Sequence, residues 1–486
     1  MSAQAIHRTT PLTGAVDGHA ILPPTHSSAR LESAALHPLT HTSPVWYAWV
    51  GFLAIVVAWG AYAYSIQFRH GLIETGMRDV VIWGLYVTNF VFFIGISHAG
   101  TLISAILRVS HAEWRRPVTR MAEVITVVSL MIGALMPIID LGRPDRVLNV
   151  ILFGQIGSAI LWDLISISTY LTGSLIYLYL PLIPDIALAR DRLAGTSHRL
   201  RHRIYAALSL RWRGTPGQRR RLERALGVMM VVIIPVAVSV HTVVSWIFGM
   251  TMRDGWNSTV FGPYFVVGAI YSGTAGIISV MYLFRRFYHL EEYIAEKQFR
   301  FLGYLMLALG LIYAYFTFAE YLTTGYKLAE GDKLLLEALM LGRYALPFWT
   351  FVIAGMLVPI LICALPWTRT IPLIVAASVL VNIGMWLKRY VIVVASLGLP
   401  QMPYEWGGYR PTWVEFSITA AAFAGFGLIF TLFAKTFPIL SVWEIKEGWE
   451  HEESRVLAID AYHVDGHVDH LPDGVAPRVA VQRIGG

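Results

Sequence analysis

Four ionisable side chains lie within or at the ends of long apolar stretches of the sequence, where burial is costly and a functional role is expected. They are two histidines, His98 and His241, and two aspartates, Asp140 and Asp163. A hydroquinone loses two protons together with its electrons, so a site that oxidises it needs proton acceptors within hydrogen-bond reach. Either imidazole can accept one proton, and either carboxylate can accept the other or relay it outward. The four residues therefore favour a quinol-oxidising site.

Trp246 follows His241 by five residues in the segment VSVHTVVSW. We expect its ring to contact the quinol, although a tryptophan near the end of an apolar stretch is also typical of an interfacial or packing residue.

Two alternative roles for the histidines and aspartates remain open. One such residue alone is often only a hydrogen-bond partner between helices, but four in one region make that structural role less favoured. His98 and His241 could instead be the two axial ligands of a single b-type haem. A di-haem quinol cytochrome would need four such histidines, and only these two of the sixteen lie well inside apolar stretches.

A second set of ionisable residues lies further along the chain. It comprises Glu320 and the adjacent cations Lys388 and Arg389 in the segment GMWLKRYVIV. Two neighbouring cations in an apolar stretch need partners or water, so they fit a proton path, a counter-ion network or side chains that extend to the interface. With them we assign Glu123, at the inner start of its apolar stretch, and Asp140 to a proton path.

The sequence offers little for a resident metal or redox group. The single cysteine, Cys363, excludes a thiolate-ligated iron–sulfur cluster and a covalently attached c-type haem, which need at least two. The segment HVDGHVDH (463–470) has histidines four residues apart, but a solvated polar tail accounts for it better than a metal site. Electrons taken from a quinol must therefore leave through a partner protein.

The composition is that of a polytopic membrane protein. Of 486 residues, 56% are hydrophobic and 14% charged, about half the charge of a soluble domain. This excludes secreted, fibrous and nucleic-acid-binding classes. A spanning helix needs about 20 mostly apolar residues. Ten stretches qualify: 44–65, 80–109, 121–140, 158–183, 228–250, 261–284, 301–322, 346–365, 371–396 and 415–437.

The distribution of basic residues predicts the orientation in the membrane. The segment 184–224 holds eleven arginines, no lysine and three acids. Connections on that side carry about 20 Lys and Arg against about 9 on the other, so this side and both termini should be cytoplasmic. Asp140 and Asp163 then lie nearer the outer face.

The outer segments 253–264 and 402–413 resemble each other and lie four helices apart. We therefore predict an all-α protein with two four-helix bundles and two flanking helices. The expected regions are an N-terminal arm (1–43), a flanking helix (44–65), a first bundle with the quinol site (80–250), a second bundle (261–396), a flanking helix (415–437) and a C-terminal tail (438–486).

Longer motifs resemble the NrfD and polysulfide-reductase family of membrane subunits, and within it most closely the ActC-type membrane subunits of bacterial alternative complex III. The resemblance rests on GLYVTNFVFFIGISHAGTLISAILRV, LMPIIDLGRPDRVLNV, SAILWDLISISTYL and VHTVVSWIFGMTMRDGWNSTVFGPYFVVGAIYSG. It implies two four-helix bundles, no redox cofactor in this chain, and a quinol pocket in the first bundle near the outer face. Matching positions in the family are taken as quinol ligands, here His98, Asp140, Asp163 and His241.

The resemblance further implies partner subunits: an iron–sulfur protein, a multihaem cytochrome c and a second membrane subunit of the same family, in a bacterial cytoplasmic membrane. Glu320, Lys388 and Arg389 match less specific positions of the family, so the resemblance implies a proton-translocating role for them less strongly. The alternative is an ion or solute transporter that works alone. Transporters often break their helices with Gly or Pro at mid-membrane, whereas here the breaks fall mostly at the ends.

Overall fold

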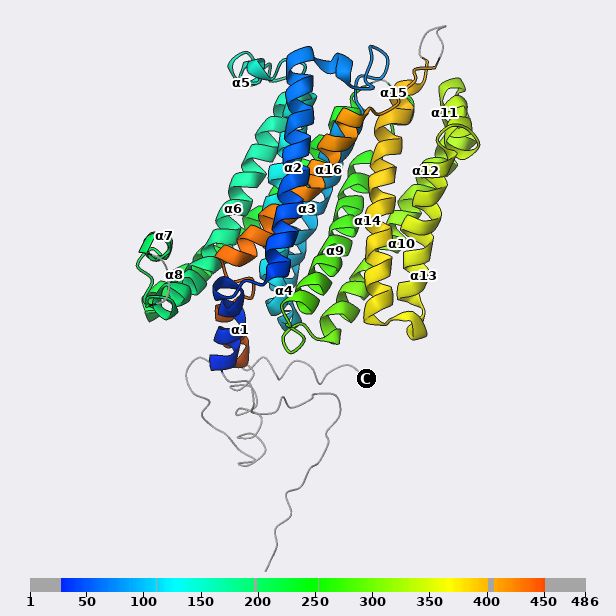
Figure 1. Cartoon of the computed structure of the whole chain (residues 1–486). Helices are drawn as coiled ribbons and strands as arrows, with labels where there is room; N and C mark the ends of the chain where they lie inside the picture. The colour runs from blue at the N-terminus through cyan, green and yellow to red at the C-terminus, as the bar shows by residue number, and fades with distance from the viewer. Residues whose placement is uncertain (1–27, 111, 196–198, 252, 401–405, 451–486) are drawn as a thin grey trace, which may run out of the picture.

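The computed structural model describes residues 28–110, 112–195, 199–251, 253–400 and 406–450 (Figure 1). All regular secondary structure in these ranges is helical. Long helices run side by side between two ends of the molecule. One end carries α1 (Ser28–Thr40) and the other carries α5 (Asn149–Leu152), and we call them the α1 end and the α5 end.

Nine helices in the described ranges are long and apolar enough to cross a membrane. They are α2 (Pro44–His70), α4 (Arg116–Asp140), α6 (Ala159–Arg192), α8 (Pro216–Gly249), α9 (Phe261–Phe287), α10 (Glu296–Lys327), the span Ala345–Ala364, the span Ile371–Gly398 and α16 (Trp413–Thr436). A further helix, α3 (Leu85–Val109), has 25 residues and is apolar over Leu85–His98. The prediction of an all-α polytopic membrane protein with about ten spans is confirmed.

The helix α3 lies at the centre of the molecule and packs against α4, α8, α9 and the span that contains α14 (Ile371–Tyr390). Two sets of helices meet at it. The first helix group is α3, α4, α6 and α8; the second is α9, α10, Ala345–Ala364 and Ile371–Gly398. The helices α2 and α16 pack on each other along one side of the first group. Residues contributed by α3 and α9 can therefore face both groups.

Several helices extend well beyond the apolar stretches that predict them. Both α6 and α8 have 34 residues and are therefore about 51 Å long, against about 30 Å of hydrocarbon. The helix α8 begins at Pro216, where Thr215 and Gln218 form a capping box. Its arginine-rich first turns continue the helix past the apolar segment, which is why hydropathy alone places its start at 228.

Two spans in the second group contain π-helical turns. Phe351–Leu357 separates α12 (Ala345–Thr350) from α13 (Val358–Ala364), and Val391–Ala395 separates α14 from α15 (Ser396–Gly398). The two spans touch backbone to backbone at Gly355 and Gly384, where an added Cβ would lie 2.5 Å or less from the opposite Cα. Such close contact of small residues is a common way to pack helices in membranes.

Within the predicted N-terminal arm, residues 28–40 form α1. Leu31, Ala35 and Leu39 of α1 are buried at the α1 end of the molecule. Glu32 binds Arg192 at 2.7 Å and also Lys446. Residues 442–450 of the tail are likewise helical. The segment 463–470 lies outside the described residues.

The remaining short elements lie at the two ends of the long helices. They are the 3-10 turns Leu72–Glu74, Glu113–Arg115, Pro144–Arg146 and Pro366–Thr368, and the helices α7 (Arg199–Leu208) and α11 (Glu330–Met340).

Candidate functional site

The two histidines predicted to act together do lie together, one on α3 and one on α8. The ring centroids of His98 and His241 are 4.4 Å apart, and both side chains are fully buried. His98 has a backbone carbonyl at each ring nitrogen: Ile94 O lies 2.7 Å from Nδ1 and Ala237 O lies 2.5 Å from Nε2. A neutral imidazole can donate to only one of them, and an imidazolium to both. The ring of His98 is therefore held in place in either protonation state.

His241 has the opposite character. Both of its ring nitrogens are buried, and neither has a hydrogen-bond partner among the described residues. Its ring packs against Phe265 of α9, with centroids 6.1 Å apart. Buried polar groups are nearly always paired, so each exception calls for a reason. Of the two histidines, His241 is the one free to bind a hydroxyl group.

Tyr170 of α6 completes the surroundings of His98. The two ring centroids are 4.8 Å apart, and the Tyr170 hydroxyl donates to Ser97 O at 3.2 Å. Asp163 lies on the same buried face of α6, about 10 Å nearer the α5 end. Its Oδ1 is buried and has no hydrogen-bond partner among the described residues. The spacing of seven residues, which is two helical turns, would have predicted from the sequence that Asp163 and Tyr170 share one face of α6.

Asp140 lies where α4 ends, also at the α5 end. Its Oδ1 is buried and lacks a hydrogen-bond partner in the described ranges. The carbonyl of the preceding residue, Ile139, accepts from Gln67 Nε2 at 2.8 Å, and Tyr86 donates to the Gln67 side chain at 2.6 Å. The structure therefore joins the two histidines directly and places both aspartates between them and the α5 end.

Trp246 does not join the histidines. Its side chain is 44% exposed, because position 246 lies about 140° around α8 from His241. The aromatic residues on the His241 side are Phe248, Phe265 and Trp256. Phe248 packs on Phe265 at 5.9 Å and on Trp256 at 5.0 Å, and the Trp256 indole donates to Ile392 O at 2.8 Å. Phe265 was not among the residues predicted from the sequence, because nothing in its local pattern marks it.

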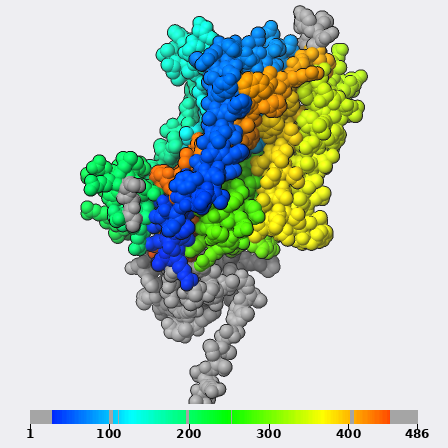
Figure 2. Space-filling view, viewed as in Figure 1, coloured from blue at the N-terminus to red at the C-terminus, as the bar shows by residue number. Residues whose placement is uncertain are grey.

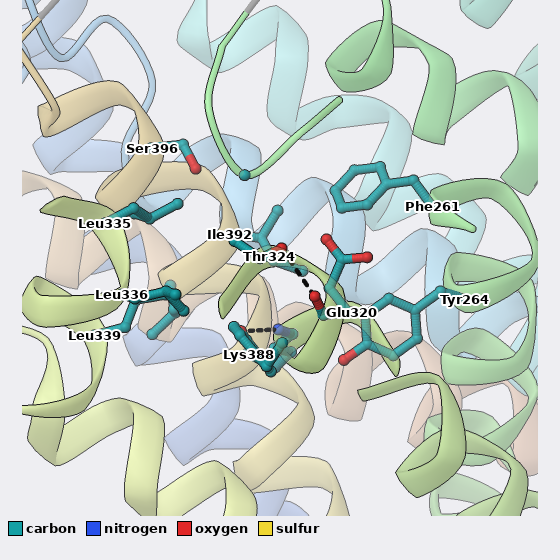
Figure 3. Close-up of a pocket in the computed structure, with 13 residues that line it drawn as sticks. Phe261, Tyr264, Glu320, Thr324, Leu335, Leu336, Leu339, Lys388, Ile392 and Ser396 are labelled. Carbon is teal, nitrogen blue, oxygen red and sulfur yellow. Dashed lines mark hydrogen bonds between the residues drawn. The ribbon is translucent and has the colours of Figure 1, made fainter. Parts of the chain in front are cut away.

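In the second helix group, Lys388 and Glu320 line one cavity (Figure 3). Lys388 Nζ donates to the Tyr321 hydroxyl at 2.7 Å and lies 5.4 Å from the ring centroid of Tyr264. The Glu320 carboxylate accepts from the Ser258 hydroxyl. The cavity has a volume of about 30 Å³ for the centres of water molecules, which is room for about two of them. Glu320 and Lys388 thus line one cavity in which water molecules could connect them.

Arg389 points away from that cavity, toward the first group. Its guanidinium is buried and lies 5.4 Å from the ring centroid of Phe265, the ring that also contacts His241. An added Cβ at Gly95 of α3 would lie 3.8 Å from Arg389 Nη2, and one at Gly268 would lie 3.1 Å from it. Two small residues thus make room for the cation between the groups.

Glu123 lies at the α1 end of α4 and belongs to a buried ionic network. It accepts from Ser104 at 3.3 Å and lies 3.9 Å from Arg120 Nε. Arg120 also binds Asp185 at 3.0 Å. This position is on the opposite side of the histidines from Asp140.

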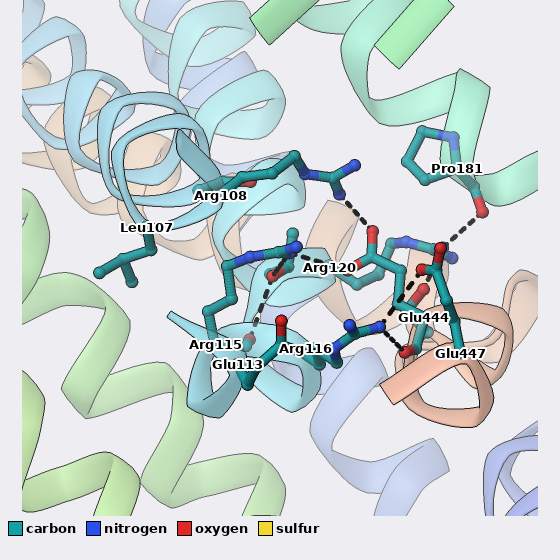
Figure 4. Close-up of polar contacts among 12 residues, drawn as sticks. Leu107, Arg108, Glu113, Arg115, Arg116, Arg120, Pro181, Glu444 and Glu447 are labelled. Atoms are coloured by element: carbon teal, nitrogen blue, oxygen red, sulfur yellow. Dashed lines mark hydrogen bonds and ion pairs between the residues drawn. The ribbon is translucent and has the colours of Figure 1, made fainter. Parts of the chain in front are cut away.

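Glu444, from the helical tail segment, occupies the middle of this network (Figure 4). It binds Arg108 and, at 3.0 Å, Arg115. Burial alone would raise the pKa of the Glu444 carboxyl, but the charges of Arg108, Arg115 and Arg120 hold that pKa below its ordinary value. These ion pairs therefore hold the helical segment 442–450 against the α1 end of the first helix group.

In the described residues, no group of three or more His, Cys, Asp or Glu side chains is arranged to hold a metal ion. Cys363 is buried and unpaired.

Comparison with known proteins identifies relatives over most of the chain. A putative dimethyl sulfoxide reductase membrane subunit of Halobacterium salinarum is 30% identical over 69% of this chain and 74% of its own. The integral membrane subunit of a menaquinone reductase of Nitratidesulfovibrio vulgaris is 25% identical over 80% of this chain and 91% of its own. An Hdr-like menaquinol oxidoreductase integral membrane subunit of Archaeoglobus fulgidus is 24% identical over 73% of this chain and 80% of its own.

The model of one protein family covers most of the same region. It is described as polysulphide reductase, NrfD, and it matches residues 73–400, which include both helix groups. The chain belongs to the polysulphide reductase NrfD family.

Proposed function

We propose that this chain is the quinone-interacting membrane subunit of a multi-subunit oxidoreductase, and that it oxidises quinol beside His241. The observation that carries the proposal is the pair of unpartnered ring nitrogens of His241, held 4.4 Å from His98 between ring centroids. The relatives named as membrane subunits of menaquinone and menaquinol enzymes support it.

The chemistry follows from the positions of these groups. Oxidation of one quinol to quinone releases two protons and two electrons. His241 accepts one proton from a quinol hydroxyl, because it has a free nitrogen, and His98 supports it from the adjacent position. Asp163 accepts the second proton, and together with Asp140 gives it a route toward the α5 end. The electrons pass to an acceptor held by a partner subunit.

The more specific proposal is an alternative complex III-like enzyme in a bacterial cytoplasmic membrane. The partners would be an iron–sulfur protein, a multihaem cytochrome c and a second NrfD-like membrane subunit. The sequence resemblance supports these partners, and the single cysteine supports an electron acceptor outside this chain. We further propose that both termini are cytoplasmic, so that protons leave on the opposite, α5 side.

We also propose that the two helix groups are the two four-helix bundles expected from the sequence, and that the second one moves protons. Glu320 and Lys388 would exchange a proton through the water-sized cavity between them. Arg389 would link this cavity to the quinol site, because it shares the ring of Phe265 with His241.

The test uses the complex purified through a tag on this chain. We expect His241→Ala to lower quinol oxidation at least tenfold, since a positioned acid–base group contributes roughly 10²–10⁴-fold. His98→Ala should lower it similarly. The exposed His70 provides the control variant, His70→Gln, which should keep full turnover. Full turnover in both His98→Ala and His241→Ala, with assembly intact, would place the quinol elsewhere.

Absorbance of the same preparations separates the rival functions. We expect the isolated chain to show no Soret band, whereas the complex should contain haem and iron–sulfur protein. A stoichiometric Soret band of the isolated chain that disappears in His98→Ala would favour axial haem ligation by the histidines. A chain that purifies alone and moves an ion or solute in vesicles would favour the transporter.

A further inference from the structure

The helix α7 is fixed at the depth where membrane spans end. Arg201 donates to Leu39 O at 2.9 Å and to Lys435 O at 3.3 Å, and the Tyr205 hydroxyl donates to Thr436 O at 2.6 Å. Thr436 is the last residue of the spanning helix α16. One face of α7 is therefore attached to the α1 end of the bundle, at the level of the membrane surface.

The opposite face of α7 is exposed and combines apolar and cationic side chains. Leu200 is 69% exposed and Ile204 is 43% exposed, and their spacing of four residues puts them on one stripe. Arg199 and Arg203 precede them by one position each and are also exposed. Figure 2 shows this part of the chain, in green, projecting from the side of the molecule.

The neighbouring start of α8 adds more positive charge at the same level. Between 199 and 224 the sequence has nine arginines and one acid, Glu223. Arg219, Arg220 and Arg224 are exposed on the first turns of α8. The exposed apolar surface of α8 begins one turn later, at Val228. Guanidinium groups thus lie within one or two turns of the surface that faces lipid.

This combination is suited to lipid headgroups. Leucine and isoleucine side chains on an interfacial helix enter the boundary between headgroups and acyl chains. Guanidinium groups bind phosphate oxygens with two parallel hydrogen bonds. An acidic protein would satisfy the charge but would not account for an apolar stripe at the level where α16 ends.

We propose that α7 and the first turns of α8 form a binding site for the phosphate headgroups of anionic phospholipids. The site is separate from the proposed quinol chemistry and does not depend on it. It would anchor this corner of the bundle to one leaflet and keep anionic lipid beside α6 and α8.

The experiment measures binding of phosphatidylglycerol and phosphatidylcholine with identical acyl chains to the delipidated, detergent-solubilised protein by native mass spectrometry. We expect phosphatidylglycerol to bind more tightly. Arg203→Gln should weaken its binding about fivefold and Arg199→Gln with Arg203→Gln correspondingly more, which is the effect of removing basic side chains at an anionic surface. Binding of phosphatidylcholine should change little.

The matched control is Arg286→Gln, because Arg286 is an exposed arginine near the α1 end of α9, between the exposed apolar residues Leu283 and Phe287. We expect it to leave phosphatidylglycerol binding within twofold. Thermal unfolding of each variant checks that the fold is kept. Equal affinity of the wild-type protein for both lipids, or equal losses in Arg203→Gln and Arg286→Gln, would overturn the proposal. A loss on Leu200→Ser with Ile204→Ser supports the contribution of the apolar stripe, and no loss refutes it.

Discussion

Asp163 and Tyr170 lie on one face of α6 two turns apart, and the Tyr170 ring packs on His98. The same helix face thus connects the histidines with a buried carboxyl about 10 Å nearer the α5 end. Asp163 is therefore the acceptor that the proposed reaction would use on the α5 side of the histidines. The arrangement gives the proposed reaction a preferred side for proton release.

We expect Asp163→Asn to lower quinol oxidation by the complex at least tenfold, because an amide cannot accept the second proton. Asp163→Glu should retain part of the activity. The control is Asp145→Asn, since Asp145 is an exposed aspartate at the same end, paired with Arg143 at 2.9 Å. Steady-state turnover with a soluble quinol analogue makes the comparison. Equal rates in Asp163→Asn and the wild-type enzyme would exclude Asp163 as an acceptor.

Lys388→Met should reduce the number of protons moved per quinol oxidised, while turnover in uncoupled vesicles falls much less. The reason is that Lys388 lies in the water-sized cavity of the second group, away from the histidines. Glu320→Gln should act in the same way. Proton uptake and release are followed with a pH-sensitive dye in vesicles that contain the complex. Lys333→Met, at an exposed lysine near Glu337, is the control. Unchanged proton stoichiometry in both cavity variants would contradict a proton path there.

The predicted orientation is tested with single cysteines in intact cells. Cys363 is replaced by Ala, and cysteines are placed at Arg213 or Arg219 on the arginine-rich side and at Asn257 or Thr259 on the other. We expect an impermeant thiol reagent to label positions 257 and 259 only. Labelling of 213 and 219 with protection of 257 and 259 would reverse the topology and the direction of proton release.

Glu444→Gln should lower the stability of the solubilised protein, because it removes the buried carboxylate that pairs with the partly buried Arg108 and Arg115. Breaking a buried ion pair costs about 3–5 kcal/mol. The more exposed Glu447, which binds Arg116 at 3.2 Å, provides the control Glu447→Gln, with a cost of about 0–1 kcal/mol. The measurement is the unfolding free energy of each variant under identical detergent conditions.

The stability that Glu444 contributes to the folded protein should also depend on pH. The pKa of Glu444 lies below its ordinary value in the folded protein, so its ion pairs contribute full stability above the ordinary carboxyl range. This contribution is lost as the pH falls through the lowered pKa. The difference in stability between the wild-type protein and Glu444→Gln should therefore be large near neutral pH and shrink in acid. A difference independent of pH would show that Glu444 acts through packing alone.

Much of the fold follows from hydropathy, since ten apolar stretches each become a helix. The meeting of His98 with His241 was also predictable, because both lie at similar depth from the ends of their stretches. The depth of Trp246 is predictable from the sequence, but depth does not give its direction: five residues along a helix turn its side chain about 140° away from that of His241. The angular position of a residue around its helix therefore separates side chains that point into the site from side chains at a similar depth that do not.

Other features depend on contacts that no local pattern records. Residues 28–40 are too short and too polar for a membrane span, and α1 is held by burial of Leu31 and Leu39 and by the ion pairs of Glu32. The buried network around Glu444 joins segments more than 300 residues apart. The meeting of Arg389 with His241 at Phe265 depends on how α9 packs between the two groups.

The bridge from Arg192 through Glu32 to Lys446 has a consequence for how the protein is made. Glu32 and Lys446 are separated by 414 residues. At a synthesis rate of about 5–20 residues per second, Lys446 follows Glu32 from the ribosome only after roughly 20–80 seconds. Until then α1 lacks one of its two cationic partners, and Arg108 and Arg115 lack the Glu444 carboxylate that the same segment brings. Synthesis of the segment that holds Glu444 and Lys446 therefore closes the α1 end of the bundle, and a protein truncated before residue 440 would expose that end to the cell's proteases.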